Sequence, residues 1–221
     1  NAGTGSVLQA DGRAWMSAAV MDGARGRFGG VLNVERVRHP VRVARALLDG
    51  PDRVLAGPGA TRFARSLGMP AWDPVTPERL RAWRQRHRDR TTQGTVGAVA
   101  LDAAGRLAAA SSTGGKPLAP PGRVSDSGMP VGNFADTHVA VACTGLGEDV
   151  IEDGLAVRIA QQVADGCPWP RAVALAGRRL HRHRRRAAAI GIDRDGRIAW
   201  TTTLDVLLAV GRAGGRRVVS F

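Results

Sequence analysis

A threonine that follows a glycine at the start of a predicted β-strand is a candidate catalytic nucleophile. Gly94 and Thr95 follow a polar, strongly charged stretch, about residues 76–94, that indicates a mobile linker or an exposed helix. If the Gly94–Thr95 bond were cut, Thr95 would carry both a hydroxyl nucleophile and a free α-amine. An α-amine titrates near pH ~8, so it can accept the hydroxyl proton close to neutral pH. A Gly-Thr pair at a strand start is also an ordinary structural feature, so the pair alone does not define a site.

Charged and small residues that could bind an amino acid follow further along the chain. Arg123 and Asp126 lie three residues apart in a Gly- and Pro-rich loop, 117–132. A guanidinium can hold a carboxylate through two hydrogen bonds, and a carboxylate can hold an ammonium group. Gly145 and Gly147 would let the backbone come close to such a ligand. The alternatives are a surface ion pair worth under ~1 kcal/mol and ordinary turn glycines.

The elements that must position these residues are predicted from apolar periodicity and from turn and stop signals. A β-hairpin is expected over residues 5–18, around Ala10-Asp11-Gly12. Further strands are expected at 29–34, 52–56, 96–101, 106–112, 138–144, 188–193, 198–202, 207–211 and 216–220. Helices are expected at 41–49, 58–67, 148–164 and 170–185. Hairpins that bracket two consecutive helices indicate layers of helix on antiparallel-rich sheet.

Length and composition are typical of one globular domain. The 221 residues, 43% of them hydrophobic, can bury a normal core. No apolar run approaches the roughly 20 residues that span a membrane, and no signal peptide is visible. We therefore expect a cytoplasmic protein with no membrane partner. Because the first residue is Asn1 rather than Met, an upstream targeting segment remains an alternative.

The strong positive charge does not by itself predict a nucleic-acid-binding function. The formal net charge is +13, but only Lys116 is a lysine and the other 31 basic residues are arginines. This skew indicates a GC-rich coding bias. With no tyrosine and four phenylalanines, a base-stacking platform is poorly supplied. The basic run 181–186 falls at a predicted helix end, where cations suit the helix dipole. We expect nonspecific polyanion binding at low salt and no specific nucleic-acid partner.

Cysteines and acidic residues indicate no metal site. Cys143 and Cys167 are too few for a disulfide framework or a metal-binding motif, so both are expected to be buried thiols. Asp193 and Asp195 resemble half of a calcium-binding loop but lack the remaining ligand spacing. They are therefore expected to form a hairpin turn.

Motifs distributed over essentially the whole chain resemble one enzyme family. Four of them occur in order at residues 94–100, 112–115, 121–127 and 143–148, and shorter ones lie at 1–7, 21–23 and 134–136. Together they resemble the N-terminal-nucleophile threonine hydrolases of the plant-type L-asparaginase, isoaspartyl peptidase and glycosylasparaginase family. The family's first strand, with its His-Gly-Gly-Ala-Gly stretch, precedes the Asn1-Ala2-Gly3 motif and has no counterpart in these residues.

The resemblance implies an α+β fold, a four-layer αββα sandwich, over a single domain of residues 1–221. It also implies a precursor that cuts itself between Gly94 and Thr95. The products are an α part, residues 1–94, and a β part, residues 95–221. The family further suggests a homodimer of processed αβ units and a structural sodium ion in the α part, with no organic cofactor.

The resemblance assigns catalytic roles to four residues. Thr95 is the nucleophile, and Thr113 matches the threonine that hydrogen-bonds and tunes it. Thr144 and Gly145 match the oxyanion hole, where fixed donors stabilise charge that develops in the transition state. Taken alone, Thr113 and Thr144 could also be strand-end hydroxyls that satisfy the backbone.

The resemblance assigns substrate binding to Arg123, Asp126, Gly145 and Gly147. Arg123 would hold the substrate α-carboxylate. Asp126, with the carbonyl of Gly145 or Gly147, would hold the α-ammonium. The implied reaction is hydrolysis of the side-chain amide of L-asparagine and of β-aspartyl (isoaspartyl) peptides through a Thr95 acyl-enzyme.

Two alternatives remain open: glycosylasparaginase activity on glycan-linked asparagine, and an inactive or nucleic-acid-binding relative. The chain has Ala187-Ala188 and residues 203–206 where the family has a Gly-Gly pair and an Asn-Thr-Glu/Pro-Gly-Met stretch. Gln93 stands where the family often has His or Asp. The departures at 187–188 and 203–206 leave the choice of substrate open, whereas cleavage is expected to tolerate Gln93.

Overall fold

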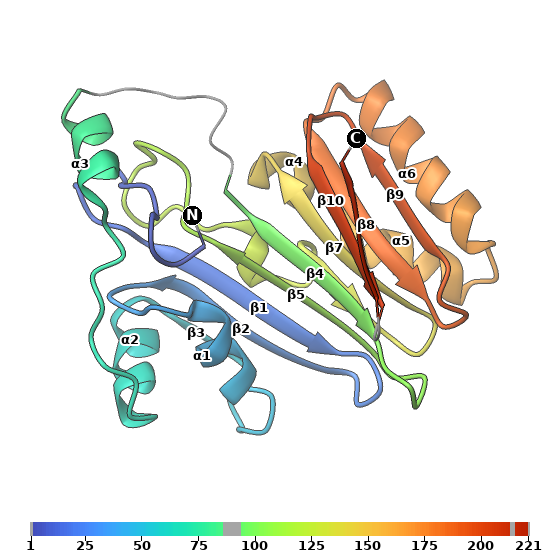
Figure 1. The fold of residues 1–221 in the computed structure, drawn as a ribbon, viewed down its shortest axis with the longest axis horizontal. Helices are drawn as coiled ribbons and strands as arrows, with labels where there is room; N and C mark the ends of the chain where they lie inside the picture. Colours follow the sequence, from blue (N-terminus) through green and yellow to red (C-terminus); the bar gives the residue numbers. More distant parts are fainter. Residues whose placement is uncertain (1, 86–93, 213–214, 221) are drawn as a thin grey trace.

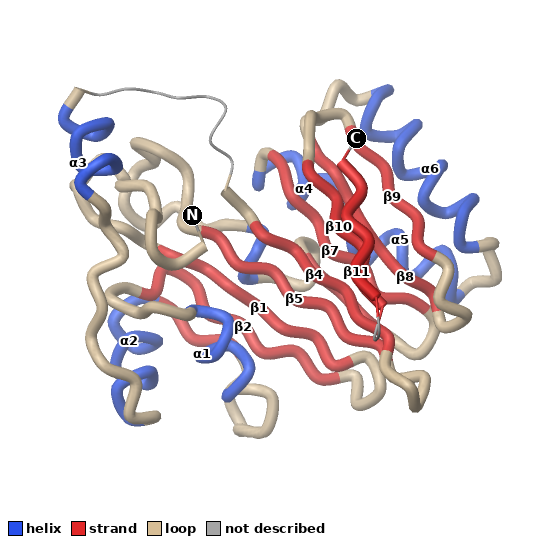
Figure 2. Tube along the Cα trace, in the orientation of Figure 1, coloured by secondary structure: helices blue, strands red, loops and turns tan. Residues whose placement is uncertain are grey.

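The computed structural model describes residues 2–85, 94–212 and 215–220, which form a mixed α/β fold with two main sheets (Figures 1 and 2). The first sheet has the order β3-β2-β1-β5-β4. Its strands are β1 (Met16–Asp22), β2 (Arg27–Val34), β3 (Val54–Ala56), β4 (Val96–Leu101) and β5 (Leu107–Thr113). The second has the order β6-β7-β8-β9. Its strands are β6 (Asn133–Ala135), β7 (Val139–Gly145), β8 (Ala187–Asp193) and β9 (Ile198–Thr202). A separate antiparallel pair comprises β10 (Leu207–Arg212) and β11 (Gly215–Ser220).

Helices cover a face of each main sheet. The helices are α1 (Pro40–Ala46), α2 (Gly57–Ser66), α3 (Pro77–Arg84), α4 (Gly147–Asp153), α5 (Leu155–Ala164) and α6 (Trp169–Arg182). Helices α1 and α2 bury Val43 and Ala60 against Val31 of the first sheet. Helices α5 and α6 bury Ile159 and Leu180 against strands β7 and β8 of the second sheet. Each sheet therefore shares an apolar core with its own pair of helices.

The two main sheets also pack against each other. Met21 and Ala109 of the first sheet share a buried apolar cluster with Ala140 of the second. The two sheets lie close together at Gly97, where a Cβ atom would lie 3.0 Å from the Cβ of Ala142. This contact brings the start of β4 beside the end of β7. Thr95, directly before β4, is thereby placed near Gly145, the last residue of β7.

Most of the predicted elements are confirmed within a few residues, but the hairpin predicted over residues 5–18 is wrong. Asp11 and Gly12 do form a turn, closed by the Gly12 N–H donating to the Gln9 carbonyl at 3.0 Å. The segment before the turn, however, hydrogen-bonds to the loop after β5: the Val7 N–H donates to Gly114 and the Ala10 N–H to Ala119. Because those backbone groups are used there, the strand starts only at Met16 and runs on through Asp22.

A further difference concerns a helix. The single helix predicted over 148–164 is broken at Gly154, whose left-handed φ of 64° ends α4 and begins α5.

Of the two alternatives for residues 76–94, a mobile linker or an exposed helix, the structure shows the helix over Pro77–Arg84, which has no buried residue. The Thr76 hydroxyl accepts from the Arg79 N–H at its start, and the Trp83 indole donates to the Gln9 carbonyl at 2.9 Å. Residues 86–93 of that linker lie outside the described residues.

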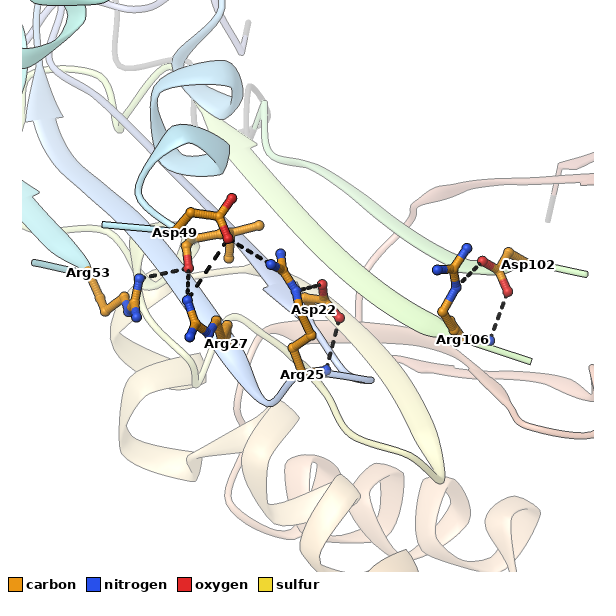
Figure 3. Close-up of polar contacts among 8 residues, drawn as sticks. Asp22, Arg25, Arg27, Asp49, Arg53, Asp102 and Arg106 are labelled. Atoms are coloured by element: carbon orange, nitrogen blue, oxygen red, sulfur yellow. Dashed lines mark hydrogen bonds and ion pairs between the residues drawn. The ribbon is translucent and has the colours of Figure 1, made fainter. Parts of the chain in front are cut away.

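At the end of the first sheet opposite Thr95, exposed ion pairs hold the hairpin turns (Figure 3). Arg25 bridges Asp22 at 2.6 Å and Asp49 at 2.7 Å, and Arg106 contacts Asp102 at 2.7 Å. Pairs this exposed contribute little to stability, because water and salt screen their charges. Their small effect on stability can be compared with that of a buried ion cluster elsewhere in the fold.

This buried cluster consists of one aspartate and two arginines, and it joins the end of α4, α6 and the segment before β8. The Asp153 side chain is 1% exposed and accepts from Arg179 at 2.6 Å and from Arg185 at 3.1 Å. Burial alone would raise the pKa of Asp153, but the hydrogen bonds from Arg179 and the neighbouring positive charges outweigh it and hold the pKa below its ordinary value. The cluster therefore contains an ionised, fully paired carboxylate that holds the end of α4 against α6 and the segment before β8.

Replacing Asp153 by asparagine is expected to destabilise the fold by about 3 kcal/mol, because two guanidinium groups lose the anion that compensates their burial. Denaturant unfolding at neutral pH measures the change. Asp102→Asn, which breaks an exposed pair, is the control and should have a much smaller effect. Equal effects of the two substitutions would contradict the role assigned to the buried cluster.

Candidate active site

One cavity collects the residues that the sequence motifs single out. It lies where the start of β4, the loop after β5, the loop before the short 3₁₀ turn η1 (Asp126–Gly128) and the end of β7 converge. The lining residues are Gly94, Thr95, Thr113, Gly115, Lys116, Pro117, Arg123, Ser125, Asp126, Gly145, Leu146 and Gly147. Segments far apart in the sequence thus supply a nucleophile candidate, an arginine, a carboxylate and several glycines to one space.

Two threonine hydroxyls meet inside this cavity. The Thr95 hydroxyl donates to Oγ1 of Thr113 at 3.3 Å, and the Gly115 N–H donates to the same oxygen at 3.3 Å. The pairing of β4 with β5 produces the contact, since Val96 lies opposite Ser112 in the ladder and places the residue before β4 beside the last residue of β5. Thr95 is therefore held next to a second hydroxyl that is itself fixed by a backbone donor.

The side chains of Arg123 and Asp126 both lie close to Gly147. A Cβ atom on Gly147 would lie 2.6 Å from Nη2 of Arg123 and 2.8 Å from Oδ1 of Asp126. These separations are far below a normal contact, so only glycine allows both side chains to approach this point. The absence of a side chain at Gly147 thus brings both charged groups to the same part of the cavity.

Asp126 is a buried carboxylate with one free oxygen. Its Oδ1 accepts from the Ser125 hydroxyl at 3.2 Å, whereas Oδ2 has no protein partner. Burial raises the pKa of Asp126 to about 6, with the hydrogen bond from Ser125 and the charge of Arg123 opposing the rise. An ionised carboxylate that lacks a partner in the interior is costly, and a bound cation would relieve that cost.

Glu148 is a site residue to which the sequence analysis assigned no role. Its two carboxylate oxygens accept from Nε of Arg123 at 3.0 Å and from Nη2 at 3.1 Å. These hydrogen bonds lower the pKa of Glu148 to about 2, so it is ionised at any neutral pH. The signal available in the sequence was its position directly after Gly147. In this structure Arg123 therefore already holds a carboxylate, in the bidentate geometry expected for a substrate.

The predicted oxyanion residues lie at the end of β7. Gly145 has a φ of 132°, and a Cβ there would collide with the Arg186 carbonyl, so the position requires glycine. Thr144, directly before it in β7, is half-buried and pairs with Ala188. Thr144 is the one predicted site residue that is not among those lining the cavity.

The positions where the chain departs from the family pattern lie behind this strand end. Ala187 pairs with Gly145 across the β7–β8 ladder, and its N–H donates to the Thr203 hydroxyl at 3.0 Å. Neither residue is among those lining the cavity. Asn1 and Gln93 lie outside the described residues.

The remaining candidates have structural roles. Cys143 is fully buried, and burial raises the pKa of its thiol, whereas Cys167 is only half-buried, which corrects the expectation for that residue. Asp193 caps the β8–β9 turn, accepting from the N–H groups of Asp195 and Arg197 at 3.0 and 2.8 Å. Arg185 of the basic run belongs to the Asp153 cluster.

Within the described ranges, no three His, Cys, Asp or Glu side chains come together as a metal site would require. Nor is any helix there both long and apolar enough to cross a membrane.

Comparison with known proteins identifies the family. A family model described as asparaginase matches residues 1–218. An isoaspartyl peptidase/L-asparaginase of Nostoc sp. is 44% identical over 97% of this chain and 73% of its own length. One from Synechocystis sp. is 42% identical over 97% and 70%, respectively. A plant-type L-asparaginase of Pyrobaculum calidifontis is 41% identical over 91% and 73%.

The fold, the cavity and these relatives define a hydrolase of the N-terminal-nucleophile class. The chain belongs to the asparaginase family that includes the isoaspartyl peptidases and plant-type L-asparaginases. The resemblance read from the four ordered motifs is thereby confirmed.

Proposed function

We propose that the chain is a self-cleaving threonine amidohydrolase that acts on L-asparagine and β-aspartyl peptides. The single observation that carries the proposal is the Thr95–Thr113 hydroxyl contact in a cavity shared with Arg123 and Asp126. The fold that goes with it is a four-layer αββα sandwich. Cleavage between Gly94 and Thr95 would divide the domain into an α part, residues 1–94, and a β part, residues 95–221.

Cleavage would turn Thr95 into both nucleophile and base. The freed α-amine takes the hydroxyl proton, and Oγ1 attacks the side-chain carbonyl of the substrate. Thr113 accepts from that hydroxyl in the resting arrangement and so orients it. The leaving amine departs with a proton, and water then releases aspartate from the acyl-enzyme. The chain's own groups suffice for these steps, without an organic cofactor.

The remaining residues would hold the substrate and its transition state. Arg123 binds the α-carboxylate with the guanidinium nitrogens that now hold Glu148, and Asp126 receives the α-ammonium at its carboxylate, whose Oδ1 lies beside Gly147 of the cavity. Gly145, with Thr144 beside it, supplies donors for the oxyanion. This arrangement needs a substrate with an amino acid head group, which asparagine and β-aspartyl peptides share.

An activity comparison tests the proposal and its alternatives. The relatives named isoaspartyl peptidase/L-asparaginase support turnover of both asparagine and a β-aspartyl dipeptide. Released aspartate is measured with asparagine, β-aspartyl-leucine and a glycosyl-asparagine. Faster turnover of the glycosyl compound would favour glycosylasparaginase activity. A salt-sensitive affinity for DNA or RNA without any hydrolysis would favour an inactive, nucleic-acid-binding relative.

The family resemblance extends the proposal to assembly and location. It suggests a homodimer of processed αβ units and a structural sodium ion in the α part, and the cytoplasmic location expected from the sequence is kept as part of the proposal. Light scattering on the processed protein measures the assembly, and a mass of one αβ unit would contradict the dimer.

A further inference from the structure

Lys116 is a second cation of the active-site cavity, and the proposed mechanism does not use it. It is the one lysine among the chain's 32 basic residues. Its side chain lines the cavity, and Nζ lies 3.5 Å from Oε1 of Glu148. The preceding residue, Gly115, is anchored through its N–H to the hydroxyl of Thr113. The backbone of Lys116 is thus held close to the reacting hydroxyls, while its side chain extends toward Glu148.

Arg123 and Lys116 contact the same carboxylate in different ways. Arg123 is 14% exposed and bonds both oxygens of Glu148 at 3.0 and 3.1 Å. Lys116 is 48% exposed and makes one contact, 3.5 Å long. A single contact at that exposure contributes little free energy, and an ammonium on a four-carbon stem can point elsewhere at small cost. Arg123 is therefore a fixed cation, and Lys116 a movable one beside it.

The two proposed substrates differ in the charges they present to this pair. Asparagine carries one carboxylate and one ammonium, which Arg123 and Asp126 would bind. A β-aspartyl dipeptide carries an additional carboxylate on the residue that leaves. Glu148 is already a carboxylate in contact with both cations, and a second carboxylate bound near it needs a cation of its own. Lys116 is the cavity-lining cation left over once Arg123 has bound the head group.

We infer that Lys116 is a specificity residue that binds the carboxylate of the leaving amino acid in β-aspartyl peptides. This inference rests on the proposed hydrolysis at Thr95. The contact raises the rate for peptides with a free terminal carboxylate and offers nothing to the ammonia released from asparagine. The competing role, in which Lys116 helps Arg123 bind the head-group carboxylate, would affect every substrate alike.

The test compares β-aspartyl-leucine with β-aspartyl-leucine amide, which lacks the terminal charge. The processed wild type is expected to prefer the free acid by about fivefold in kcat/KM, or about 1 kcal/mol. In Lys116→Met the preference should fall to about one, and Lys116→Arg should retain part of it. Because the ratio is formed within each variant, general damage to the cavity cancels. Raising the ionic strength should shrink the wild-type preference.

Three results would overturn the inference, and each has a separate signature. An unchanged acid-to-amide ratio in Lys116→Met would mean that the terminal carboxylate is bound elsewhere. An equal loss for asparagine, the acid and the amide would place Lys116 at the head group. A processed wild type that hydrolyses none of the three would contradict the proposed function as well.

Discussion

Thr95→Ala is expected to lower hydrolysis of asparagine and β-aspartyl-leucine by at least about 10³-fold, because the variant has no nucleophile. The adjacent groups remain, but donors and charges that bind the head group cannot form an acyl-enzyme by themselves. Thr113 would also lose the hydroxyl that donates to it at 3.3 Å. Released aspartate, measured over hours at high enzyme concentration, gives the residual rate.

Two control variants make this result specific to the hydroxyl of Thr95. Thr95→Ser retains a hydroxyl at the same position and is expected to keep measurable processing and turnover. Thr137→Ala removes an exposed threonine hydroxyl next to β7 and should leave both within about twofold of wild type. Activity of Thr95→Ala within tenfold of wild type would exclude the threonine mechanism.

Asp126→Asn is expected to change function and stability in opposite directions. The substitution removes the anion proposed for the α-ammonium, so kcat/KM should fall by about 10²-fold or more. It also removes a buried charge whose Oδ2 has no partner. The variant should therefore be about 1–3 kcal/mol more stable than wild type at pH 8. Denaturant unfolding and steady-state kinetics measure the two effects.

The pKa of Asp126 determines the pH dependence of both effects. Burial raises it from 3.8 to about 6, so the folded protein binds this proton more tightly than the unfolded chain. Protonated Asp126 is therefore tolerated below about pH 4, and the cost of ionising it appears as the pH rises through about 6. The stability advantage of Asp126→Asn should vanish at pH 4 and be complete above pH 7. Wild-type kcat/KM should fall below about pH 6, where the carboxylate becomes neutral.

The matched control for this experiment is Asp52→Asn, which neutralises an exposed carboxylate. It should shift stability by less than about 0.5 kcal/mol at either pH. A destabilised Asp126→Asn variant at pH 8, or one with normal kcat/KM, would contradict the assignment of Asp126 as the ammonium-binding group.

Local sequence signals predicted the elements that local chemistry determines. The hairpin β4–β5 and the hairpin β8–β9 follow from alternating runs around Asp-containing turns, and both were predicted within a residue or two. The hairpin predicted over 5–18 was wrong, although its turn signal was correct. The segment before the turn hydrogen-bonds to the loop after β5, which lies far along the chain and which local signals cannot reveal. Periodicity alone also could not show that Gly154 would take a left-handed φ within an otherwise helical run.

For the cavity too, the sequence predicted which residues take part but not the contacts that depend on how distant segments pack. The motifs brought Thr95, Thr113, Arg123 and Gly147 into the prediction by residue type and order. The ion pair between Arg123 and Glu148 was missed, because it depends on how the loop before η1 packs against the start of α4. The sequence singled out Lys116 only as the one lysine of the chain. Its position in the cavity is what supports the substrate-binding role proposed for it.

The measurement that tests the central claim most directly is the mass of the purified polypeptide, wild type beside Thr95→Ala. The account predicts that the wild type separates into two pieces, residues 1–94 and residues 95–221, with Thr95 as the new N-terminus. Thr95→Ala should remain a single chain of the full 23.2 kDa. A wild type that stays whole after prolonged incubation, or a variant that is cut at the same bond, would contradict the claim that Thr95 is a self-generated N-terminal nucleophile.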